Sequence, residues 1–432
     1  MELLKVDTLE EAMEKLLAYA GGAVSPNSEE SCRTGLSLEK EEVSIFHLLG
    51  RVLAEDILSC ENVPGFNRST VDGYAVRACD TGGASESLPC FLKVIGEVEM
   101  GCDPSELMVG PGECVYVPTG GVVPLGADAM VMVEYCEAFG TDQMAVYSSV
   151  SEGNNMVLEG DDISCGQVVL RRGQKVSPAD MGVLACLGRT SAIVYKPWKL
   201  VILSTGDEII DPVKIPGPGQ VRDVNTYGLY GLAKEYGFDV LGFQIVEDNA
   251  EVLRQRVELA MRQADLVILS GGSSQGKKDE TASVIGTLAS SGVLTHGLAV
   301  KPGKPTILGF DEPTRTALIG LPGHPVAAML LFREVAGRLW ETLTGQYQVE
   351  KKTSVEGILT ANVAASPGRK TWQLVTVDFE GKRDEAAGLP QVTPVWGKSG
   401  MIRTLSQADG YMEIEKNDEG INRGEQVKVW LL

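Results

Sequence analysis

The first forty residues begin with a helical pattern that then breaks off. Apolar residues recur at helical spacing, at Leu9, Met13, Leu16 and Leu17. Thr8 and Glu11 have the spacing of a capping box, which places the start of a helix here. A polar stretch over residues 25–35 indicates a loop, and the run VSIFHLLGRVLAEDI (43–57) predicts a second helix-like segment.

The pattern changes to short β-rich pieces between about residues 92 and 150. FLKVIGEVEM, ECVYVPT and AMVMVEY are separated by Gly and Pro, which favours a compact all-β insert. Beyond it, PADMGVLACLG predicts a helix with Pro178 in its first turn.

From Trp198 the chain alternates apolar strands with amphipathic helices. KLVILSTG, VLGFQIV and DLVILSGG are the predicted strands, with helices between them. This order indicates a parallel sheet covered on both faces, whose ligands gather at the carboxyl ends of the strands. STGDE and SGGSSQGKKD lie at those ends, and after Leu343 short strands indicate a small, separate β domain.

Composition and charge narrow the function. The 432 residues are 44% hydrophobic and 22% charged, as in a globular chain of several domains. The net charge of −21 disfavours nucleic acid and membrane surfaces as partners, and an anionic substrate needs local Lys or a metal ion. Nine scattered Cys without zinc spacing, no signal peptide and no apolar run long enough to span a bilayer favour a soluble, cytoplasmic protein.

SGGSSQGKKD (270–279) nearly has the spacing of a P-loop. Lys278 stands where a P-loop needs Ser or Thr for Mg²⁺, so an ATPase P-loop is disfavoured. Two interpretations stay open: a glycine-rich cradle for a phosphate or oxyanion, with Ser274 and Asp279 as ligands, or a plain turn between a strand and a helix.

Two lysines and several acidic residues are further candidates for a ligand-binding site. Lys301 and Lys304 flank a Pro-Gly turn and can point toward one anion, although solvated surface lysines would look the same. In STGDE, Asp207 and Glu208 follow a buried strand, and Asp207 could instead cap a helix. Asp248 is either a site acid or a helix cap.

The remaining motifs are each only weak evidence for a functional site. Asp72 in STVDGYAV stands beside a glycine that permits a tight turn, and Thr119 in PTGG lies in another turn. The three histidines, His47, His296 and His324, show no metal-ligand spacing, so a structural role is favoured. No G-x-S-x-G motif supports a Ser-His-Asp triad.

Taken in order, VPGFNRSTVDGYAVR, PTGGVVPLGADAMVMVE, STGDE, GQVRDVNTYGL, SGGSSQGKKD, KPGKP and GLPGHPVAA resemble the molybdopterin molybdenumtransferase family, which includes the E domain of gephyrin. The resemblance implies a multidomain α/β plus β protein that works as a homodimer. Its expected parts are an elongated discontinuous domain (1–65 and 161–197), a β-rich insert (66–160), an α/β molybdopterin-binding domain resembling molybdopterin adenylyltransferases (198–345) and a C-terminal β barrel (346–432).

The implied reaction is Mg²⁺-dependent insertion of molybdate into adenylylated molybdopterin, with release of AMP, downstream of a molybdopterin adenylyltransferase. By motif position, Asp248 and Asp279 resemble acids near Mg²⁺ and the phosphates. The expected molybdate pocket comprises Ser274, Lys301, Lys304 and Pro305. The remaining expected site residues are Asp72, which is expected to reach across the dimer, Thr119, Asp162 and Glu208, with Arg369 and Ser399 as weaker candidates.

The chain departs from the family pattern at three positions. Val157 and Gly297 stand where many members have Arg and Lys, and His324 replaces a common Asn. Tungstate in place of molybdate, a non-catalytic binding scaffold like gephyrin and a nucleotide hydrolase stay open as alternatives. The retained acids and lysines argue against the scaffold.

Overall fold

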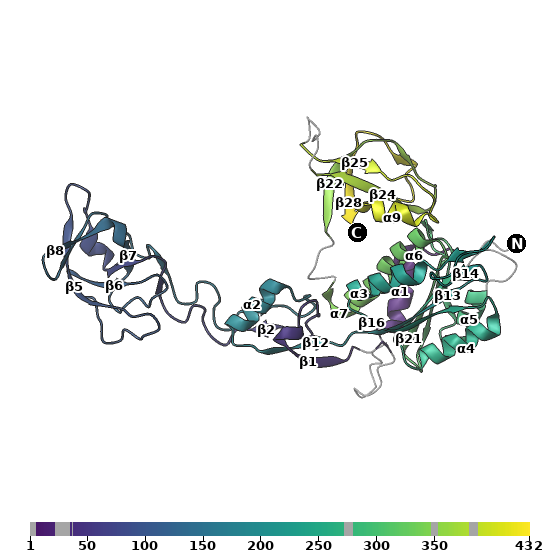
Figure 1. The fold of residues 1–432 in the computed structure, drawn as a ribbon, viewed down its shortest axis with the longest axis horizontal. Coiled ribbons are helices and arrows are strands. Elements are labelled where there is room, and N and C mark those ends of the chain that lie inside the picture. The colour runs from purple at the N-terminus through teal and green to yellow at the C-terminus, as the bar shows by residue number, and fades with distance from the viewer. Residues whose placement is uncertain (1–5, 22–34, 37, 272–279, 347–352, 380–387) are drawn as a thin grey trace.

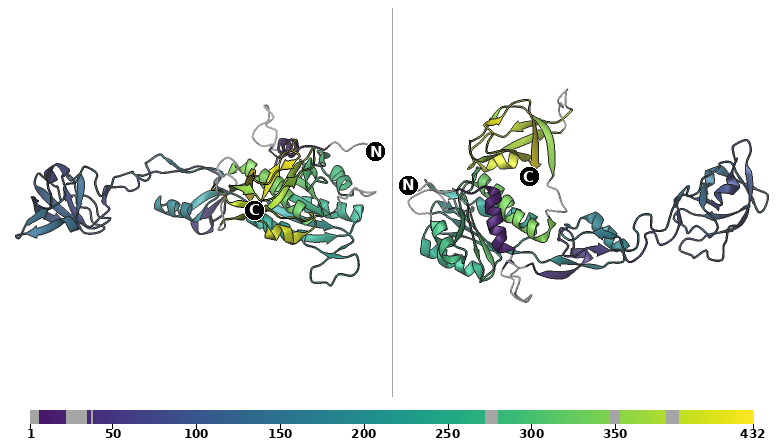
Figure 2. Two further views of the ribbon diagram at one scale, coloured as in Figure 1. Left: turned by 90° about the horizontal axis from the view of Figure 1, so that it is seen from above. Right: turned by 180° about the vertical axis from the view of Figure 1, so that it is seen from behind.

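The chain forms an elongated molecule with a small β unit at one end and two packed units at the other (Figures 1 and 2). This computed structural model describes residues 6–21, 35–36, 38–271, 280–346, 353–379 and 388–432. Within these ranges, no helix has the length and apolar character needed to cross a membrane. The architecture expected from the sequence, a central α/β unit with a β-rich insert and a β barrel, is confirmed.

The central unit is a six-stranded sheet in the order β16-β13-β17-β21-β20-β18, in which only β20 runs antiparallel to its neighbours. Its strands are β13 (Lys199–Thr205), β16 (Asp239–Val246), β17 (Leu266–Gly271), β18 (Val293–His296), β20 (Ile307–Asp311) and β21 (Thr316–Leu321). The strands are mainly parallel, as the alternating pattern predicts. Their carboxyl ends therefore meet at one edge.

Helices cover both faces of this sheet. One face is packed by α1 (Leu9–Ala20), α3 (Asn225–Glu235), α6 (Pro325–Leu331), the π-helical turn η4 (Phe332–Gly337) and α7 (Arg338–Thr344). The other is packed by α4 (Ala250–Met261) and α5 (Glu280–Leu288). Alternate residues of β13 divide between the two cores, with Leu200 and Ile202 on the first face and Val201 and Leu203 on the second. The capping box of α1 is present.

The C-terminal barrel closes through β24 (Lys370–Asp378), β25 (Gln391–Pro394), β22 (Ser354–Leu359), β28 (Gln426–Leu431) and β26 (Gly410–Ile414), which pairs again with β24. The pair β23 (Val363–Ala364) and β27 (Gly420–Ile421) and the helix α9 (Ile402–Gln407) flank it. One short strand of the α/β unit, β19 (Val300–Lys301), extends the barrel by pairing with β24. This pairing joins the two units directly.

The insert is a further six-stranded sheet at the far end of the molecule (Figure 1). It comprises β4 (Gly73–Val76), β5 (Cys90–Glu97), β6 (Glu113–Val117), β7 (Ala129–Met132), β8 (Cys136–Phe139) and β9 (Gln143–Val146). The predicted all-β region is confirmed, and its first strand, β4, precedes the range of about 92–150 that the short β-rich pieces indicate.

Two-stranded ribbons and one helix connect the insert to the central unit. The pairs are β1 (Lys40–Ser44) with β12 (Ser191–Tyr195), β2 (Ile57–Leu58) with β11 (Val168–Leu170), and β3 (Arg68–Ser69) with β10 (Met156–Val157). The helix α2 (Pro178–Cys186) starts with Pro178 in its first turn, as predicted, and Ser177 caps it. The domain boundaries themselves stay predictions.

The helix predicted over residues 43–57 is wrong. The structure has the end of β1, a 3₁₀ turn (Ile45–His47) and β2 in that range. Backbone groups of β1 bond to β12, nearly 150 residues later in the chain, and Gly50 takes a left-handed conformation with φ +75°. Pairing between distant segments and a helix-breaking glycine thus override the apolar spacing.

Candidate active site

Acids meet at the carboxyl ends of β13 and β16, the edge where the sequence places a ligand. Thr205 and Val246 are paired at the last register position of these strands. The Asp207 carboxylate accepts a hydrogen bond from the Asp248 backbone N–H at 3.2 Å, and both residues are exposed. Asn249 caps α4, so neither acid is a helix cap.

The acids do not form a metal cage by themselves. Within the described residues, no three His, Cys, Asp or Glu side chains gather to hold a metal ion. Asp279 and Ser274, which the sequence also assigns to this edge, lie outside the described residues. A cation here would need ligand oxygens in addition to the carboxylates of Asp207 and Asp248.

Glu208 folds back over its own turn. A Cβ atom at Gly206 would lie 2.8 Å from a Glu208 carboxylate oxygen, so glycine leaves the room in which this carboxylate lies. The Glu208 carbonyl accepts from the Val221 N–H at 2.8 Å, beside the short parallel pair β14 (Ile209–Ile210) and β15 (Val221–Arg222). The turn thus holds Glu208 close to Asp207.

Lys301 and Arg369 lie at one turn of the barrel. Lys301 pairs with Thr371 in the contact between β19 and β24, and its ammonium donates to the Ser366 hydroxyl at 2.8 Å. The Arg369 N–H donates to the Ser366 carbonyl at 3.3 Å. Sequence reasoning missed Ser366, because only the packing of the barrel against the α/β unit brings it to Lys301.

Lys304 and Pro305 continue the same loop, half-buried. The Lys304 carbonyl accepts from the N–H groups of Leu298 (2.8 Å) and Thr306 (2.9 Å), which fixes the backbone. Its ammonium makes no hydrogen bond or ion pair among the residues that the structure describes. The loop therefore presents one lysine tethered to Ser366 and one lysine that is free to bind an anion.

Ser399 lies at a second contact between the barrel and the α/β unit. Its hydroxyl is 2.9 Å from Nδ1 of His324, the residue before α6, and its carbonyl accepts from the Val326 N–H at 3.2 Å. The position at which this chain carries His instead of the common Asn is thus an interdomain contact.

Asp72 and Thr119 meet in the insert. The Asp72 carboxylate accepts from the Thr119 N–H at 2.8 Å and from its hydroxyl at 3.0 Å. Gly73, beside Asp72, is needed for strand packing rather than for a turn, since a Cβ there would lie 2.0 Å from the Val131 carbonyl oxygen. PTGG does form a turn, with Gly120 at φ +84°.

The insert and the α/β sheet lie at opposite ends of one chain in all three views (Figures 1 and 2). Asp72 and Thr119 therefore do not reach the acids or lysines of their own chain. Asp162 lies in the connecting ribbons, exposed, with its N–H donating to the Val63 carbonyl at 3.1 Å. The predicted site residues of the insert are thus separated within one chain from those of the α/β unit and the barrel, with Asp162 between them.

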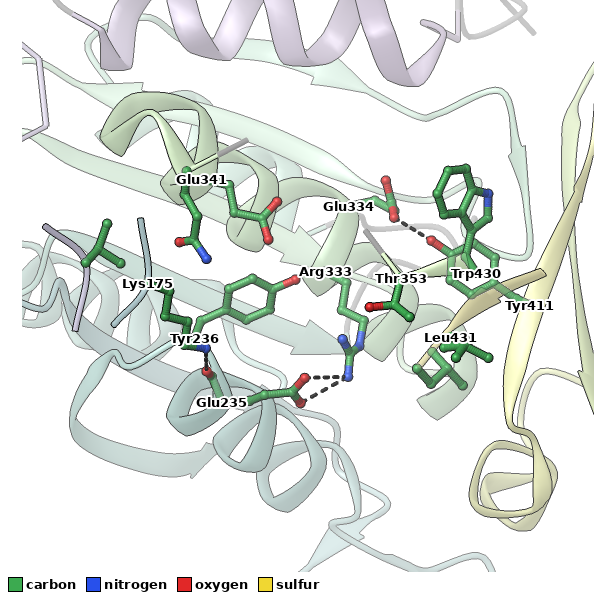
Figure 3. Close-up of a pocket in the computed structure, with 13 residues that line it drawn as sticks. Lys175, Glu235, Tyr236, Arg333, Glu334, Glu341, Thr353, Tyr411, Trp430 and Leu431 are labelled. Atoms are coloured by element: carbon green, nitrogen blue, oxygen red, sulfur yellow. Dashed lines mark hydrogen bonds and ion pairs between the residues drawn. The ribbon is translucent and has the colours of Figure 1, made fainter. Parts of the chain in front are cut away.

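A cavity of about 410 Å³ lies between the elongated part, the α/β unit and the barrel (Figure 3). Arg333 forms an ion pair with Glu235, with nitrogen–oxygen distances of 3.1 and 3.0 Å, and the Tyr411 hydroxyl donates to Glu334 at 2.7 Å. Burial, followed by the charge of Glu334, raises the pKa of Tyr411. The cavity lining contains none of the predicted site residues. The bond from Tyr411 to Glu334 joins the barrel to the α/β unit, whereas the ion pair of Arg333 with Glu235 lies within the α/β unit.

Three family models match successive parts of the chain. Residues 8–188 match the MoeA N-terminal region (domain I and II), residues 201–340 the "Probable molybdopterin binding domain" and residues 356–432 the MoeA C-terminal region (domain IV).

Individual relatives agree with these matches. A protein of Methanocaldococcus jannaschii is 34% identical, with 91% of this chain and 92% of that protein covered. A molybdopterin molybdenumtransferase of Haemophilus influenzae is 33% identical, with 78% and 80% covered. The crystal structure of a molybdopterin biosynthesis MoeA protein from Pyrococcus horikoshii has a TM-score of 0.76 at 32% identity, with 99% of each chain covered.

The fold and these matches together therefore define an enzyme of molybdenum cofactor biosynthesis. More specifically, the chain belongs to the molybdopterin molybdenumtransferase (MoeA) family.

Proposed function

We propose that this protein inserts molybdate into adenylylated molybdopterin in a Mg²⁺-dependent reaction that releases AMP. The observation that carries the proposal is the loop with Lys301 and Lys304, whose Lys301 ammonium is tethered to Ser366 beside the turn that carries Arg369, so that three basic residues lie on two adjoining loops in a chain of net charge −21. Such a locally reversed charge is what a tetrahedral oxyanion requires.

The acids at the sheet edge, Asp207 and Asp248, suit the phosphate groups of adenylylated molybdopterin, which would bind through Mg²⁺. Oxygen atoms of Asp207 and Asp248 are hard ligands of the kind that Mg²⁺ accepts, and phosphate oxygens of the substrate would complete the coordination. Mg²⁺ bound there would neutralise charge on the phosphoanhydride. Asp279, following SGGSSQGKK, is proposed as a further ligand.

We propose that the site is completed by a second copy of the chain. The pair Asp72–Thr119 is preformed, and it lies far from the acids and lysines of its own chain. In a homodimer, this pair would lie over the partner's α/β unit. The upstream reaction that supplies the substrate is adenylylation of molybdopterin.

The test is AMP release from adenylylated molybdopterin by the purified protein, with and without Mg²⁺, in three parallel arms: molybdate, tungstate and no oxyanion. Release stimulated by molybdate supports the proposal, whereas preference for tungstate assigns the other metal. Lys304→Met should abolish the stimulation, while Lys40→Met, on exposed strand β1, should not. Absence of release in every arm contradicts the proposal and favours a binding scaffold.

A further inference from the structure

The lysine loop, residues 297–306, is closed by hydrogen bonds within its own backbone. The Gly297 N–H donates to the Thr306 carbonyl at 2.8 Å, and the Leu298 N–H donates to the Lys304 carbonyl at 2.8 Å. Leu298 itself is fully buried. Because the backbone of Lys304 is bonded to Leu298, whatever holds Leu298 in place also sets the position of Lys304.

The start of the chain runs along one side of the lysine loop. Asp7, which lies just before helix α1, is directly opposite Leu298 in a parallel bridge. The Asp7 N–H donates to the Gly297 carbonyl at 3.1 Å, and the Asp7 carbonyl accepts from the Ala299 N–H at 2.7 Å. Asp7 therefore holds both neighbours of the residue to which Lys304 is bonded.

The barrel holds the other side of the lysine loop. The Ala299 carbonyl accepts from the Lys370 N–H at 2.9 Å, and β19, which contains Lys301, continues this pairing with β24. The Lys370 ammonium also lies 3.5 Å from a carboxylate oxygen of Glu10, in the first turn of α1. The backbone of Ala299 is thus bonded to Asp7 on one side and to the barrel on the other, two residues before Lys301.

The Asp7 carboxylate ties the start of the chain to the central sheet. Its Oδ2 atom accepts from the Thr295 hydroxyl at 2.8 Å and from the Lys15 ammonium at 2.6 Å. Thr295 is buried in the edge strand β18, and the Asp7 side chain is only 11% exposed, so the bond between these two residues is shielded from water. Hydrogen bonds to a charged group are among the stronger ones, and loss of this bond would leave the buried Thr295 hydroxyl without its acceptor.

We infer that Asp7 is a positioning residue for oxyanion binding, because its carboxylate fixes the segment to which the lysine loop is hydrogen-bonded. This inference rests on the proposed function and adds to the site a residue that none of the sequence motifs contains. The effect passes through the backbone of Leu298 and Ala299, so it changes where the ammonium groups of Lys301 and Lys304 lie and not the charge that they carry. Loss of the Asp7 carboxylate should therefore weaken oxyanion binding more than it slows the reaction of the bound substrate.

Asp7→Ala tests the inference in two measurements. Steady-state AMP release at varied molybdate concentration should show a KM for molybdate raised about tenfold, with kcat within about twofold of the unaltered value. Hydrogen exchange should become faster at the amides of Leu298, Ala299 and Thr306, whose N–H groups are bonded within the loop or to Asp7. Asp7→Asn keeps an acceptor for Thr295, so it should restore most of both properties.

Thr8→Ala is the matched control at the same end of α1. The Thr8 hydroxyl bonds to the Glu11 carboxylate at 3.0 Å and to the Glu11 N–H at 3.2 Å, so its removal weakens the start of the helix. Thr8→Ala should lower stability and leave both the KM for molybdate and the exchange of the loop amides unchanged.

Three results would overturn the inference: an equal rise of KM in Thr8→Ala, unchanged exchange of the loop amides in Asp7→Ala, or faster exchange there with an unchanged KM. If the unaltered protein releases no AMP in any arm, the proposed function fails. Faster exchange in Asp7→Ala alone would then still show that Asp7 positions the lysine loop, and unchanged exchange would refute that role as well.

Discussion

The Lys301 ammonium donates to the Ser366 hydroxyl at 2.8 Å, across the boundary between the α/β unit and the barrel. The barrel therefore sets the position of a lysine whose backbone belongs to the other unit. This contact lies at the turn that carries Arg369. The position of the cations thus depends on how the two units pack.

Ser366→Ala should raise the KM for molybdate several-fold with a smaller effect on kcat. The reason is that Lys301 keeps its charge and loses its tether, so that its side chain samples more orientations. Steady-state AMP release at varied molybdate concentration measures this effect. Lys301→Met should be far more damaging than Ser366→Ala, and equal effects of the two would contradict a positioning role for Ser366.

Mixing two inactive variants tests whether the active site is shared between subunits. Asp72→Ala and Asp248→Ala should each be inactive alone. When the two variants are refolded together in equal amounts, about half of the dimers contain one chain of each variant. Each of these mixed dimers has one intact site out of two, so activity should return to about a quarter of the unaltered level. No recovery, in a mixture shown to contain mixed dimers, would place both residues in the same subunit's site.

Arg68 lies directly opposite Val157 in the pair of β3 and β10. Directly paired residues of antiparallel strands share a face of the ribbon, so Arg68 offers a cation beside the position where many family members carry Arg. We predict that Arg68→Met lowers kcat/KM at least tenfold and that Arg68→Met with Val157→Arg recovers part of the loss. Arg171→Met, also exposed in the connecting ribbons, is the control, and an equal loss in this control would refute the prediction.

Gly297 cannot be replaced by the lysine of many family members without strain. Its φ is +104°, and a Cβ would lie 3.0 Å from a methyl carbon of Val6. Gly297→Lys should therefore lower the free energy of unfolding by about 1–3 kcal/mol. Gly297→Ala should show a similar loss in chemical denaturation, because the backbone and not the charge is responsible. A free energy of unfolding that is unchanged in Gly297→Ala would show that the backbone adapts and would contradict this prediction.

Asp265 should make stability fall as pH rises from about 4 towards its raised pKa. Burial raises its pKa, although its carboxylate accepts from the Lys199 N–H at 2.8 Å. Between the ordinary value, about 3.9, and the raised one, the folded protein binds more protons than the unfolded chain, so the free energy of unfolding decreases with pH. Asp265→Asn, which keeps an acceptor for Lys199, should gain stability over the unaltered protein as pH increases through this window. Denaturation curves at several pH values would show it, and a gain that shrinks with pH would refute it.

The sequence by itself determined the elements whose signals are local. Helix α1 starts at its capping box, α2 starts at Pro178, and the alternation after Trp198 yields a mainly parallel sheet with STGDE at the carboxyl end of β13. Hydrophobic periodicity and capping depend on neighbours in the chain, which is why they can be read from it.

Only the tertiary structure decided which distant residues meet. The apolar run after Val43 became strand and turn because β12 pairs with it, and Ser366 reached Lys301 because the barrel packs against β19. Asp7 reached Thr295, 288 residues later in the chain, because the start of the chain packs beside the lysine loop. Such contacts join segments tens to hundreds of residues apart, so no local pattern in the sequence encodes them.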